Sequence, residues 1–454
     1  MESLPEQNGQ KKPETSGPTS SGRRDFLKTS TGVAAGLAAL SPARMINAAH
    51  VSGRDVIRLG LVGCGGRGTG AVTQAMNTEG STELVAVADV FEDRLNGCLE
   101  SVTKEHQDKV KVDDDHKFVG LDGYQKVLAS DIDLVILATP PGFRPLHFEK
   151  AVEAGKHIFM EKPVATDPAG VRRILAANEI AKAKSLAVGV GLQRHHESRY
   201  KNCIAKLQDG IIGDINFARA YWNSGGVWTR NRQPEQSELE YQMRNWYYFN
   251  WLCGDHITEQ HIHNIDVINW LFEGYPVKAQ GVGGRQVRTG KEHGEIYDHH
   301  MVEFTYANGA TMLSQCRHIP GCWNAVSEHA HGANGWSDIS SGRIYDKSGK
   351  VLWAQRENEN GWQQEHHDLF AKIRQGEFPN EAEYGAKSTM TSILGRMATY
   401  TGREVTWDQA INSEITLADF DSITDLSGEA PVNPNSDMTY NIMQPGQCWE
   451  KVVG

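Results

Sequence analysis

Three glycines and one aspartate have the spacing of a dinucleotide-binding turn. Gly63, Gly65 and Gly68 directly follow an apolar segment. In such a turn the first glycine permits the tight bend, the second lets backbone N–H groups approach a pyrophosphate, and the third lets the next helix pack close to the strand. Asp89 ends a second apolar segment at the distance where a carboxylate accepts hydrogen bonds from ribose hydroxyls. The pattern predicts an NAD(P) site.

Asp89 also bears on which dinucleotide binds. A carboxylate at this position repels the 2′-phosphate of NADP, so the sequence favours NAD. The alternative interpretation is that Asp89 only caps the helix that starts near Glu92, and that Arg67 or Arg94 contacts a phosphate. We therefore expect NAD as the cofactor and rank NADP second.

A second set of polar residues lies on one predicted helix, 256–271. His256, Glu259, His263 and Asp266 fall within about 80° of one another at 100° per residue, on a segment otherwise rich in Ile, Val, Trp and Leu. The four-residue spacing puts Glu259 and His263 on one face, where a carboxylate orients an imidazole and raises its proton affinity. A general base that removes a hydroxyl proton needs this arrangement.

Two other interpretations of this polar stripe, His256, Glu259, His263 and Asp266, stay open. His256, Glu259 and His263 are side chains that a divalent metal accepts, with His299 or His300 as a further donor. Structural hydrogen bonding is the third interpretation. We expect acid–base chemistry and assign no metal ligand.

Aromatic and basic residues surround this helix in the sequence. Aromatic faces stack on the C–H surfaces of sugar rings, and Trp and Tyr add hydrogen bonds, so the composition suits a carbohydrate pocket. Aromatic residues also fill cores and subunit interfaces. The arginines that lie between these aromatic residues in the sequence suit an anionic or heavily hydroxylated ligand. The residues expected to contact substrate are Trp228, Arg244, Tyr248, His256 and His263.

Alternating strands and helices position the first set of residues. Predicted strands at 57–62, 83–88, 133–138, 157–160 and 186–190 alternate with helical segments, as parallel βαβ units demand. In an open parallel sheet, ligands bind beyond the carboxyl ends of the strands. The residues at such ends include Thr139, Glu161, Lys162 and Gln193.

The glycine turn shares the chain with two further motifs. These are Ala-Thr-Pro-Pro at 138–141, with His147 downstream, and Glu-Lys-Pro at 161–163. Together they resemble the glucose–fructose oxidoreductase/inositol dehydrogenase family, known as Gfo/Idh/MocA, over about residues 56 to 410. The resemblance implies an α/β protein, in which a Rossmann domain precedes an α+β domain whose open, mostly antiparallel sheet covers the nicotinamide. Lys162 then corresponds to the active-site lysine of the family.

The family also carries a helix motif, G-G-x-x-x-D-x-G-x-H-x-x-D, that supplies a catalytic histidine. Residues 254–266 align with this motif without a gap, and His263 takes the place of the catalytic histidine. Gly254 and Asp266 match as well. Three departures suggest that the substrate side differs from that of the sugar dehydrogenases. They are Asp255, Glu259 and His261, in place of Gly, Asp and Gly.

The motifs and the resemblance together assign the site. Lys162 and His263 are the expected catalytic residues, and Glu259 is expected to orient the base. The expected cofactor-binding residues are Gly63, Gly65, Gly66, Arg67, Gly68, Asp89, Arg94, Thr139, Pro140, His147, Glu161, Lys162 and Gln193.

Composition excludes several classes of partner and site. The net charge is −11 and no stripe of lysine and arginine interleaves with aromatic residues, which excludes a nucleic-acid partner. No apolar stretch reaches the roughly 18 residues that span a bilayer. The 7 cysteines include no C-x-x-C pair, so neither a disulfide framework nor a zinc knuckle is indicated.

The first 49 residues are predicted to be a targeting segment and a polar tail. Residues 22–28, Gly-Arg-Arg-Asp-Phe-Leu-Lys, resemble the bacterial twin-arginine signal, and a weakly apolar stretch follows at 31–40. We expect export to the periplasm by the twin-arginine machinery, which carries folded proteins. The remainder divides into an NAD-binding Rossmann domain, 50–190, and a substrate-binding domain, 191–454, which also forms a homo-oligomer, either a dimer or a tetramer.

These features predict an exported oxidoreductase that acts on a hydroxyl group of a sugar or glycoside and keeps its NAD bound. His263 or Lys162 removes the hydroxyl proton while a hydride passes to the nicotinamide. The alternative is a redox-neutral NAD-dependent glycosidase, in which transient oxidation of a ring hydroxyl permits elimination of the glycosidic group before the hydride returns. A non-catalytic sugar-binding protein is the third class.

Overall fold

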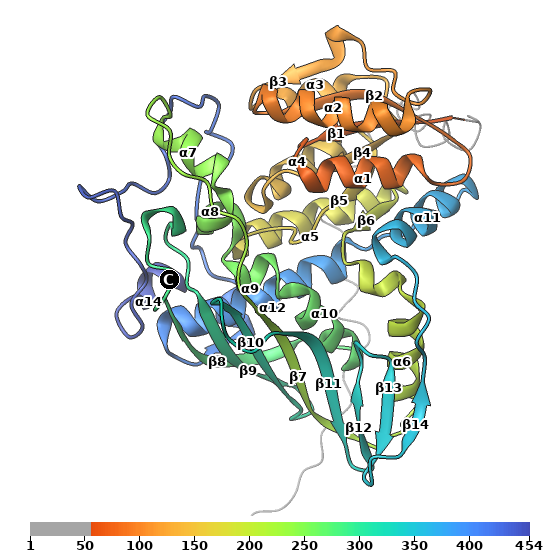
Figure 1. Cartoon of the computed structure of the whole chain (residues 1–454), viewed down its shortest axis with the longest axis vertical. Helices are drawn as coiled ribbons and strands as arrows, with labels where there is room; N and C mark the ends of the chain where they lie inside the picture. Colours follow the sequence, from red (N-terminus) through yellow and green to blue (C-terminus); the bar gives the residue numbers. More distant parts are fainter. Residues whose placement is uncertain (1–55) are drawn as a thin grey trace, which may run out of the picture. The chain divides into compact units, whose positions relative to one another are not determined.

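The computed structural model describes residues 56–454, so the predicted export signal at 1–49 lies outside the described residues. The predicted α/β architecture is confirmed, because one parallel sheet and one mostly antiparallel sheet are each packed against helices (Figure 1). All 7 cysteines lie in this part of the chain and are free thiols. None of its helices is long and apolar enough to cross a membrane.

The first sheet has the strand order β3-β2-β1-β4-β5-β6, and all neighbours are parallel. This is the order of the Rossmann fold. The strands are β1 Val56–Val62, β2 Ser81–Asp89, β3 Lys117–Val119, β4 Leu134–Leu137, β5 His157–Met160 and β6 Val188–Val190. The helices between them are α1 Gly66–Met76, α2 Glu92–His106, α3 Gly123–Ala129, α4 Arg144–Glu153 and α5 Pro168–Ala183.

Burial explains the continuous apolar runs of this sheet. Every residue of β4 and β5 is buried, since helices cover both faces of a parallel sheet. One later helix also packs here: Leu369, Phe370 and Ile373 of α11, Gly361–Arg374, join the core cluster that contains residues of β1 and β2. The predicted domain boundary at 190 stays a prediction.

The second sheet has the strand order β14-β13-β12-β11-β7-β10-β9-β8-β15, and only the β7–β10 pair within it is parallel. A hairpin turn at Asn308–Gly309 joins β9 to β10, and Gly309 has the positive φ of 82° that such a turn favours. The strands are β7 Ile215–Ser224, β8 Pro276–Gly284, β9 His299–Tyr306, β10 Thr311–His318, β11 Ala325–Gly332, β12 Gly335–Asp338, β13 Arg343–Asp346, β14 Val351–Ala354 and β15 Val405–Thr406.

Helices α9, α10 and α12 cover one face of this sheet through contacts with β7 to β11 (Figure 1). The other face carries exposed apolar side chains, including Val282 and Met301, which are cross-strand neighbours. The remaining helices are α6 Ser198–Gln208, α7 Glu238–Arg244, α8 Asn250–Cys253, α9 His256–Glu259, α10 Ile262–Leu271, α12 Ala382–Thr401, α13 Trp407–Ile411 and α14 Trp449–Val452.

The predicted single helix at 256–271 is wrong, because the chain forms two helices, α9 and α10. In a continuous α-helix the carbonyl of Glu259 would accept from the N–H of His263, four residues later. Instead the N–H of His263 donates to the carbonyl of Gln260, at 3.4 Å. The interruption leaves the Glu259 carbonyl available to another donor.

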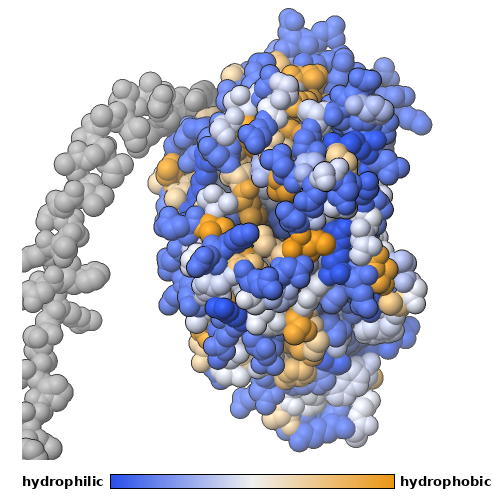
Figure 2. Space-filling model, turned by 90° about the vertical axis from the view of Figure 1, so that its left-hand side faces the viewer, coloured by the Kyte–Doolittle hydropathy of each residue, from blue (hydrophilic) through white to orange (hydrophobic). Residues whose placement is uncertain are grey.

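The surface agrees with the acidic, polar composition. Hydrophilic residues predominate on the face that Figure 2 shows, and hydrophobic residues form small separate patches there.

Candidate active site

The loop after β1 has the shape predicted for a dinucleotide-binding turn. Gly63 has a φ of 97°, and a Cβ atom there would lie 2.6 Å from backbone atoms of Ala138 and Thr139. A Cβ atom on Gly68 would lie 1.8 Å from the carbonyl oxygen of Gly63. Neither position therefore admits a side chain. A Cβ atom on Gly65 would meet nothing within 4 Å, so the space before α1 is open.

Asp89, at the end of β2, is hydrogen-bonded to this turn. Its Oδ2 atom accepts from the N–H of Cys64 at 2.6 Å, and its Oδ1 atom accepts from the N–H of Phe91 at 2.9 Å. Burial raises the pKa of the Asp89 carboxyl, while the N–H donors of Phe91 and Cys64 lower it. The carboxylate thus fixes the turn and retains lone pairs for ribose hydroxyls.

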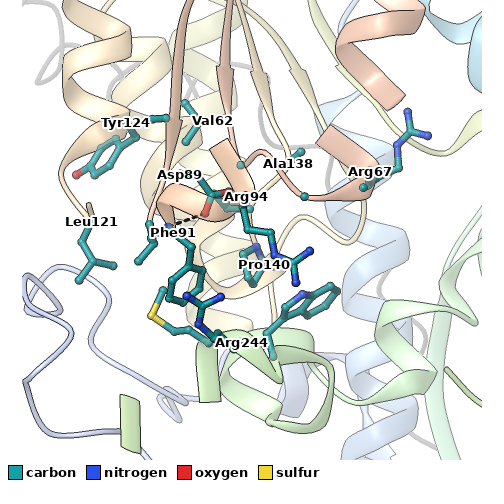
Figure 3. Close-up of a pocket in the computed structure, with 18 of the residues that line it drawn as sticks. Val62, Arg67, Asp89, Phe91, Arg94, Leu121, Tyr124, Ala138, Pro140 and Arg244 are labelled. Carbon is teal, nitrogen blue, oxygen red and sulfur yellow. Dashed lines mark hydrogen bonds between the residues drawn. The ribbon is translucent and has the colours of Figure 1, made fainter. Parts of the chain in front are cut away.

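A pocket of about 460 Å³ lies at these strand ends (Figure 3). It brings together most of the predicted cofactor-binding residues, and Gly68 packs directly behind its glycine turn. The predicted residues that line it are Gly63, Gly65, Gly66, Arg67, Asp89, Arg94, Thr139, Pro140 and His147.

A segment from the second half of the chain covers the same pocket. Trp228 and Arg244, which were expected to contact substrate, line it beside Asp89 and Arg94, and their substrate contact stays a prediction. The Arg244 guanidinium lies 3.9 Å from the ring centroid of Phe91 and pairs with Asp93 at 3.2 Å (Figure 3). Other lining residues of this segment are Arg230, Met243 and Trp246.

Several residues that line the pocket were not predicted, because no local sequence pattern marks them. Phe91, Leu121 and Tyr124 are ordinary core residues by type, and only the fold brings them to the strand ends. Arg144 is fully buried and donates to the carbonyl oxygens of Leu137 and Thr139, the latter at 2.6 Å. It fixes the chain after β4.

His147 supports the pocket as a neutral side chain. Its Nδ1 atom lies 3.1 Å from the hydroxyl of Thr139, and its ring packs 4.4 Å from that of Tyr124. Burial, followed by the charges of Arg144 and Arg173, lowers the pKa of His147 to about 3. The imidazole is therefore uncharged at neutral pH.

Glu161 and Gln193 lie beyond β5 and β6 but do not line this pocket. The Oε1 atom of Glu161 accepts from Nε of Arg67 at 2.6 Å, so the predicted phosphate contact of Arg67 competes with an ion pair. The Oε1 atom of Gln193 is buried and has no hydrogen-bond partner in the described part of the chain.

The ammonium group of Lys162 contacts Glu259, which is the last residue of α9. It donates to the Glu259 carbonyl oxygen at 2.6 Å and to the carboxylate at 3.0 Å. The two side chains are only 10% and 9% exposed, so solvent screens this pair weakly. The expectation that Glu259 orients His263 is wrong in this geometry, since its carboxylate is bonded to Lys162.

His263 lies close enough to this pair to feel its charge. Burial, followed by the charges of Lys162 and Arg194, holds the pKa of His263 well below its usual range. Its ring stacks on Trp222 at 6.0 Å, and it remains 8% exposed. The neutral imidazole has a lone pair that can accept a proton, and its lowered pKa makes it a weaker base than an ordinary histidine.

The other members of the predicted stripe point elsewhere. Asp266 bonds to His195 at 2.8 Å and to Ser388 at 2.7 Å. His256 is fully buried, so its predicted substrate contact is wrong. Tyr248 is also buried, and its hydroxyl donates to the Val227 carbonyl at 3.0 Å, which leaves no surface for substrate. The proposed metal set of His256, Glu259 and His263 does not converge.

The sequence also matches known families. Residues 57–192 match the oxidoreductase family with an NAD-binding Rossmann fold, and residues 200–332 match the GFO/IDH/MocA C-terminal domain. Together the two segments make up more than half of the chain. The chain belongs to the Gfo/Idh/MocA family. Its first sheet is thus an NAD-binding Rossmann domain of an oxidoreductase family.

Similar proteins include inositol dehydrogenases. The chain is 28% identical over 256 residues to inositol 2-dehydrogenase of Pseudomonas fluorescens, a match that covers 56% of this chain and 65% of that relative, which is less than two thirds of its length.

The fold is similar to that of solved structures. Scyllo-inositol dehydrogenase of Lactobacillus casei with bound NAD(H) and scyllo-inositol matches 78% of this chain and 99% of its own, with a TM-score of 0.60 and 20% identity. Aldose-aldose oxidoreductase of Caulobacter crescentus matches 77% and 99%, with a TM-score of 0.61 and 17% identity. At these identities the structures show the shared fold.

Proposed function

We propose that the protein is an NAD-dependent oxidoreductase that acts on a hydroxyl-bearing carbon of a sugar or polyol. The observation that carries this proposal is the neutral His263 beside the Lys162–Glu259 pair at the end of β5. The similarity to inositol dehydrogenases supports a polyhydroxylated substrate.

The residues of the chain divide the chemistry between them. Bound NAD supplies the hydride acceptor. His263 accepts the proton of the substrate hydroxyl, and the Lys162 ammonium stabilises the negative charge that develops on the same oxygen. Glu259 holds the ammonium in place through two acceptors. The carbon loses a hydride and the oxygen loses a proton, so the product is a carbonyl compound, which is a ketone where a secondary alcohol reacts.

The cofactor is proposed to be NAD and to stay bound between turnovers. Asp89 at the ribose end of the pocket disfavours a 2′-phosphate. Trp228, Arg244 and Trp246 cover the pocket from the second half of the chain, which slows release. Mass spectrometry of the denatured protein tests this directly, and we expect NAD rather than NADP, in stoichiometric amount.

A substrate panel tests the activity itself. Inositol isomers, free aldoses and aryl glycosides are supplied to the purified protein, and both NADH absorbance and released aglycone are followed. We expect reduction of bound NAD by a polyol or sugar, without aglycone release. Aglycone release without any net NADH would instead establish the redox-neutral glycosidase, and binding without either would overturn an enzymatic function.

Export and self-association are also proposed. Residues 22–28 favour twin-arginine export, which a fusion of residues 1–49 to a reporter protein tests, with the Arg23→Lys, Arg24→Lys double variant as the control. The exposed Val282 and Met301 on the uncovered sheet face favour a homo-oligomer. Light scattering of Met301→Lys against the parent protein tests that interface.

A further inference from the structure

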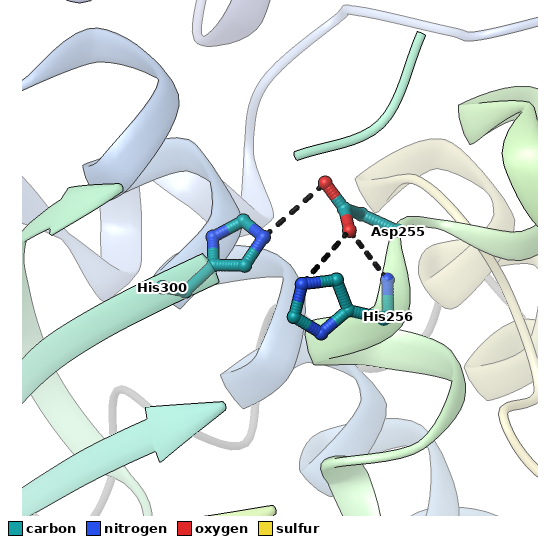
Figure 4. Close-up of side chains that lie close together, drawn as sticks. All are labelled: Asp255, His256 and His300. Carbon is teal, nitrogen blue, oxygen red and sulfur yellow. Dashed lines mark hydrogen bonds and ion pairs between the residues drawn. The ribbon is translucent and has the colours of Figure 1, made fainter. Parts of the chain in front are cut away.

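A second polar cluster lies in the interior, one turn before Glu259. Asp255 precedes α9, His256 begins it, and His300 belongs to β9 (Figure 4). All three are buried, and one ligand atom from each lies within 4.8 Å of the others. The His300 Nε2 and Asp255 Oδ2 atoms are 3.2 Å apart, and the His256 Nε2 and Asp255 Oδ1 atoms are 3.8 Å apart.

Three of the four ring nitrogens in this cluster, both of His256 and Nε2 of His300, lack hydrogen-bond partners in the described part of the chain. Neither nitrogen of His256 has one among residues 56–454, and its side chain is 0% exposed. The same holds for both nitrogens of His318, whose ring stacks on His256 at 4.3 Å. Each unpaired buried polar atom costs about 1–3 kcal/mol. A bound group that interacts with the nitrogen lone pairs would therefore remove this cost.

The hydrogen bonds around His300 direct such a lone pair at Asp255. The hydroxyl of Thr399 donates back to the helix carbonyl of Arg396 at 3.0 Å, so its oxygen accepts from Nδ1–H of His300 at 2.9 Å. In that tautomer the Nε2 atom carries a lone pair and faces a carboxylate oxygen. Two such atoms at 3.2 Å repel unless a proton or a metal ion lies between them. A hydrogen bond that fixes the outer nitrogen is typical of metal-ligating histidines.

The backbone holds Asp255 in an unfavourable conformation. Its φ is 68°, in the left-handed region that favours glycine, and such a residue costs about 1–3 kcal/mol. The Oδ2 atom is held by the hydroxyl of Tyr400 at 2.7 Å and the N–H of Tyr297 at 3.0 Å. The chain thus keeps a carboxylate oriented toward the two histidines at a position where glycine would be relaxed.

We propose that Asp255, His256 and His300 bind one divalent transition-metal ion, of which Zn²⁺ fits best. Two imidazoles and one carboxylate are a usual zinc ligand set. Ligands at about 2.0–2.1 Å from a tetrahedral ion are about 3.3 Å apart, which matches the 3.2 Å between His300 and Asp255 Oδ2, whereas His256 lies 3.8 Å from Oδ1 and would have to move closer to bind. The ion fixes the start of α9 and so holds Glu259 in position for Lys162.

Metal analysis of the full chain, with any affinity tag removed, tests the proposal. We expect about one zinc per chain after gel filtration, and a visible Co²⁺ absorption after exchange that reports imidazole and carboxylate ligation. Asp255→Gly is the informative variant, because glycine relaxes the φ of 68° and keeps the fold while it removes one ligand. We expect this variant to retain NAD but to lose the metal.

His263→Ala is the matched control, since His263 lies outside the proposed ligand set. It should keep the metal, whereas loss of metal in this variant would overturn the assignment in favour of the catalytic histidine. Parent protein that contains no metal, develops no Co²⁺ absorption and shows no change in melting temperature with added Zn²⁺ would also overturn it. Equal metal content in Asp255→Gly and the parent would exclude Asp255 as a ligand.

Discussion

The ammonium of Lys162 bonds to both the carbonyl and the carboxylate of Glu259, 97 residues away in the sequence. The carbonyl is available because the helix is interrupted between α9 and α10, where the N–H of His263 turns to Gln260. The interruption thus serves the active site directly. It supplies an acceptor that positions the lysine without neutralising it.

Lys162→Met should abolish turnover while the protein keeps its fold and its NAD. Methionine has a similar length but carries no charge, so the developing alkoxide loses its stabilising ammonium, at a cost of about 10² in kcat or more. Steady-state kinetics and mass spectrometry of the bound cofactor measure the two effects. Lys182→Met, a surface variant, is the control. Comparable turnover in Lys162→Met and the parent would refute the role.

His263→Ala should slow turnover by about 10²–10⁴, the usual contribution of general acid–base catalysis. Glu259→Gln should cost less, because glutamine keeps an oxygen acceptor for Lys162 and the backbone carbonyl is unchanged. The two variants are compared by kcat under saturating substrate. If Glu259→Gln proved the more damaging change, the ion pair would matter more than the base.

The pH profile should lack an acid limb in the ordinary histidine range. Burial and the charges of Lys162 and Arg194 lower the pKa of His263, so the imidazole stays neutral as the pH falls from about 8 to about 5.5. A profile of kcat/KM over this range tests the expectation. A limb near the usual histidine pKa of about 6.5 that is absent from the residual activity of His263→Ala would contradict it.

The sequence predicted those features that short apolar patterns encode. Strands β4, β5 and β6 are continuous buried runs, whereas β3 has no buried residue and was missed. Strands β11 and β12 were missed because Ser, Glu, His and Gly interrupt their alternation, and β13 and β14 were missed because each has only 4 residues. The cover over the pocket was also missed, since the contact of Arg244 with Phe91 joins distant segments. The helix interruption was missed because residues 256–271 contain no glycine or proline that would mark it.

Arg244→Ala should release the cofactor faster without a large loss of stability. The variant removes the contact with Phe91 and the ion pair with Asp93, which together contribute about 1–2 kcal/mol, so NAD should dissociate roughly 5- to 30-fold faster. Stopped-flow displacement of NADH fluorescence measures the rate. Arg356→Ala removes an exposed arginine elsewhere and should leave the rate unchanged. Equal rates in both variants would show that the covering segment does not retain the cofactor.

His196 should make stability depend on pH above neutrality. Its Nδ1 atom lies 2.7 Å from Asp368 and its Nε2 atom 3.1 Å from Glu381. Burial lowers the pKa of His196, but these two carboxylates outweigh burial and raise it to about 9. The folded state thus holds the proton more tightly than the unfolded state, whose histidine pKa is about 6.5.

The sign of the effect follows from this difference. The stabilisation is fully present below about pH 6.5 and is lost as the pH rises through about 9, for a total of about 3 kcal/mol. His196→Gln should therefore lower the free energy of unfolding markedly at about pH 6 and little at about pH 10. Urea denaturation of both proteins at the two pH values measures this. Asp368→Asn should remove part of the same difference, and a His196→Gln effect of equal size at both pH values would show that the contribution is packing rather than charge.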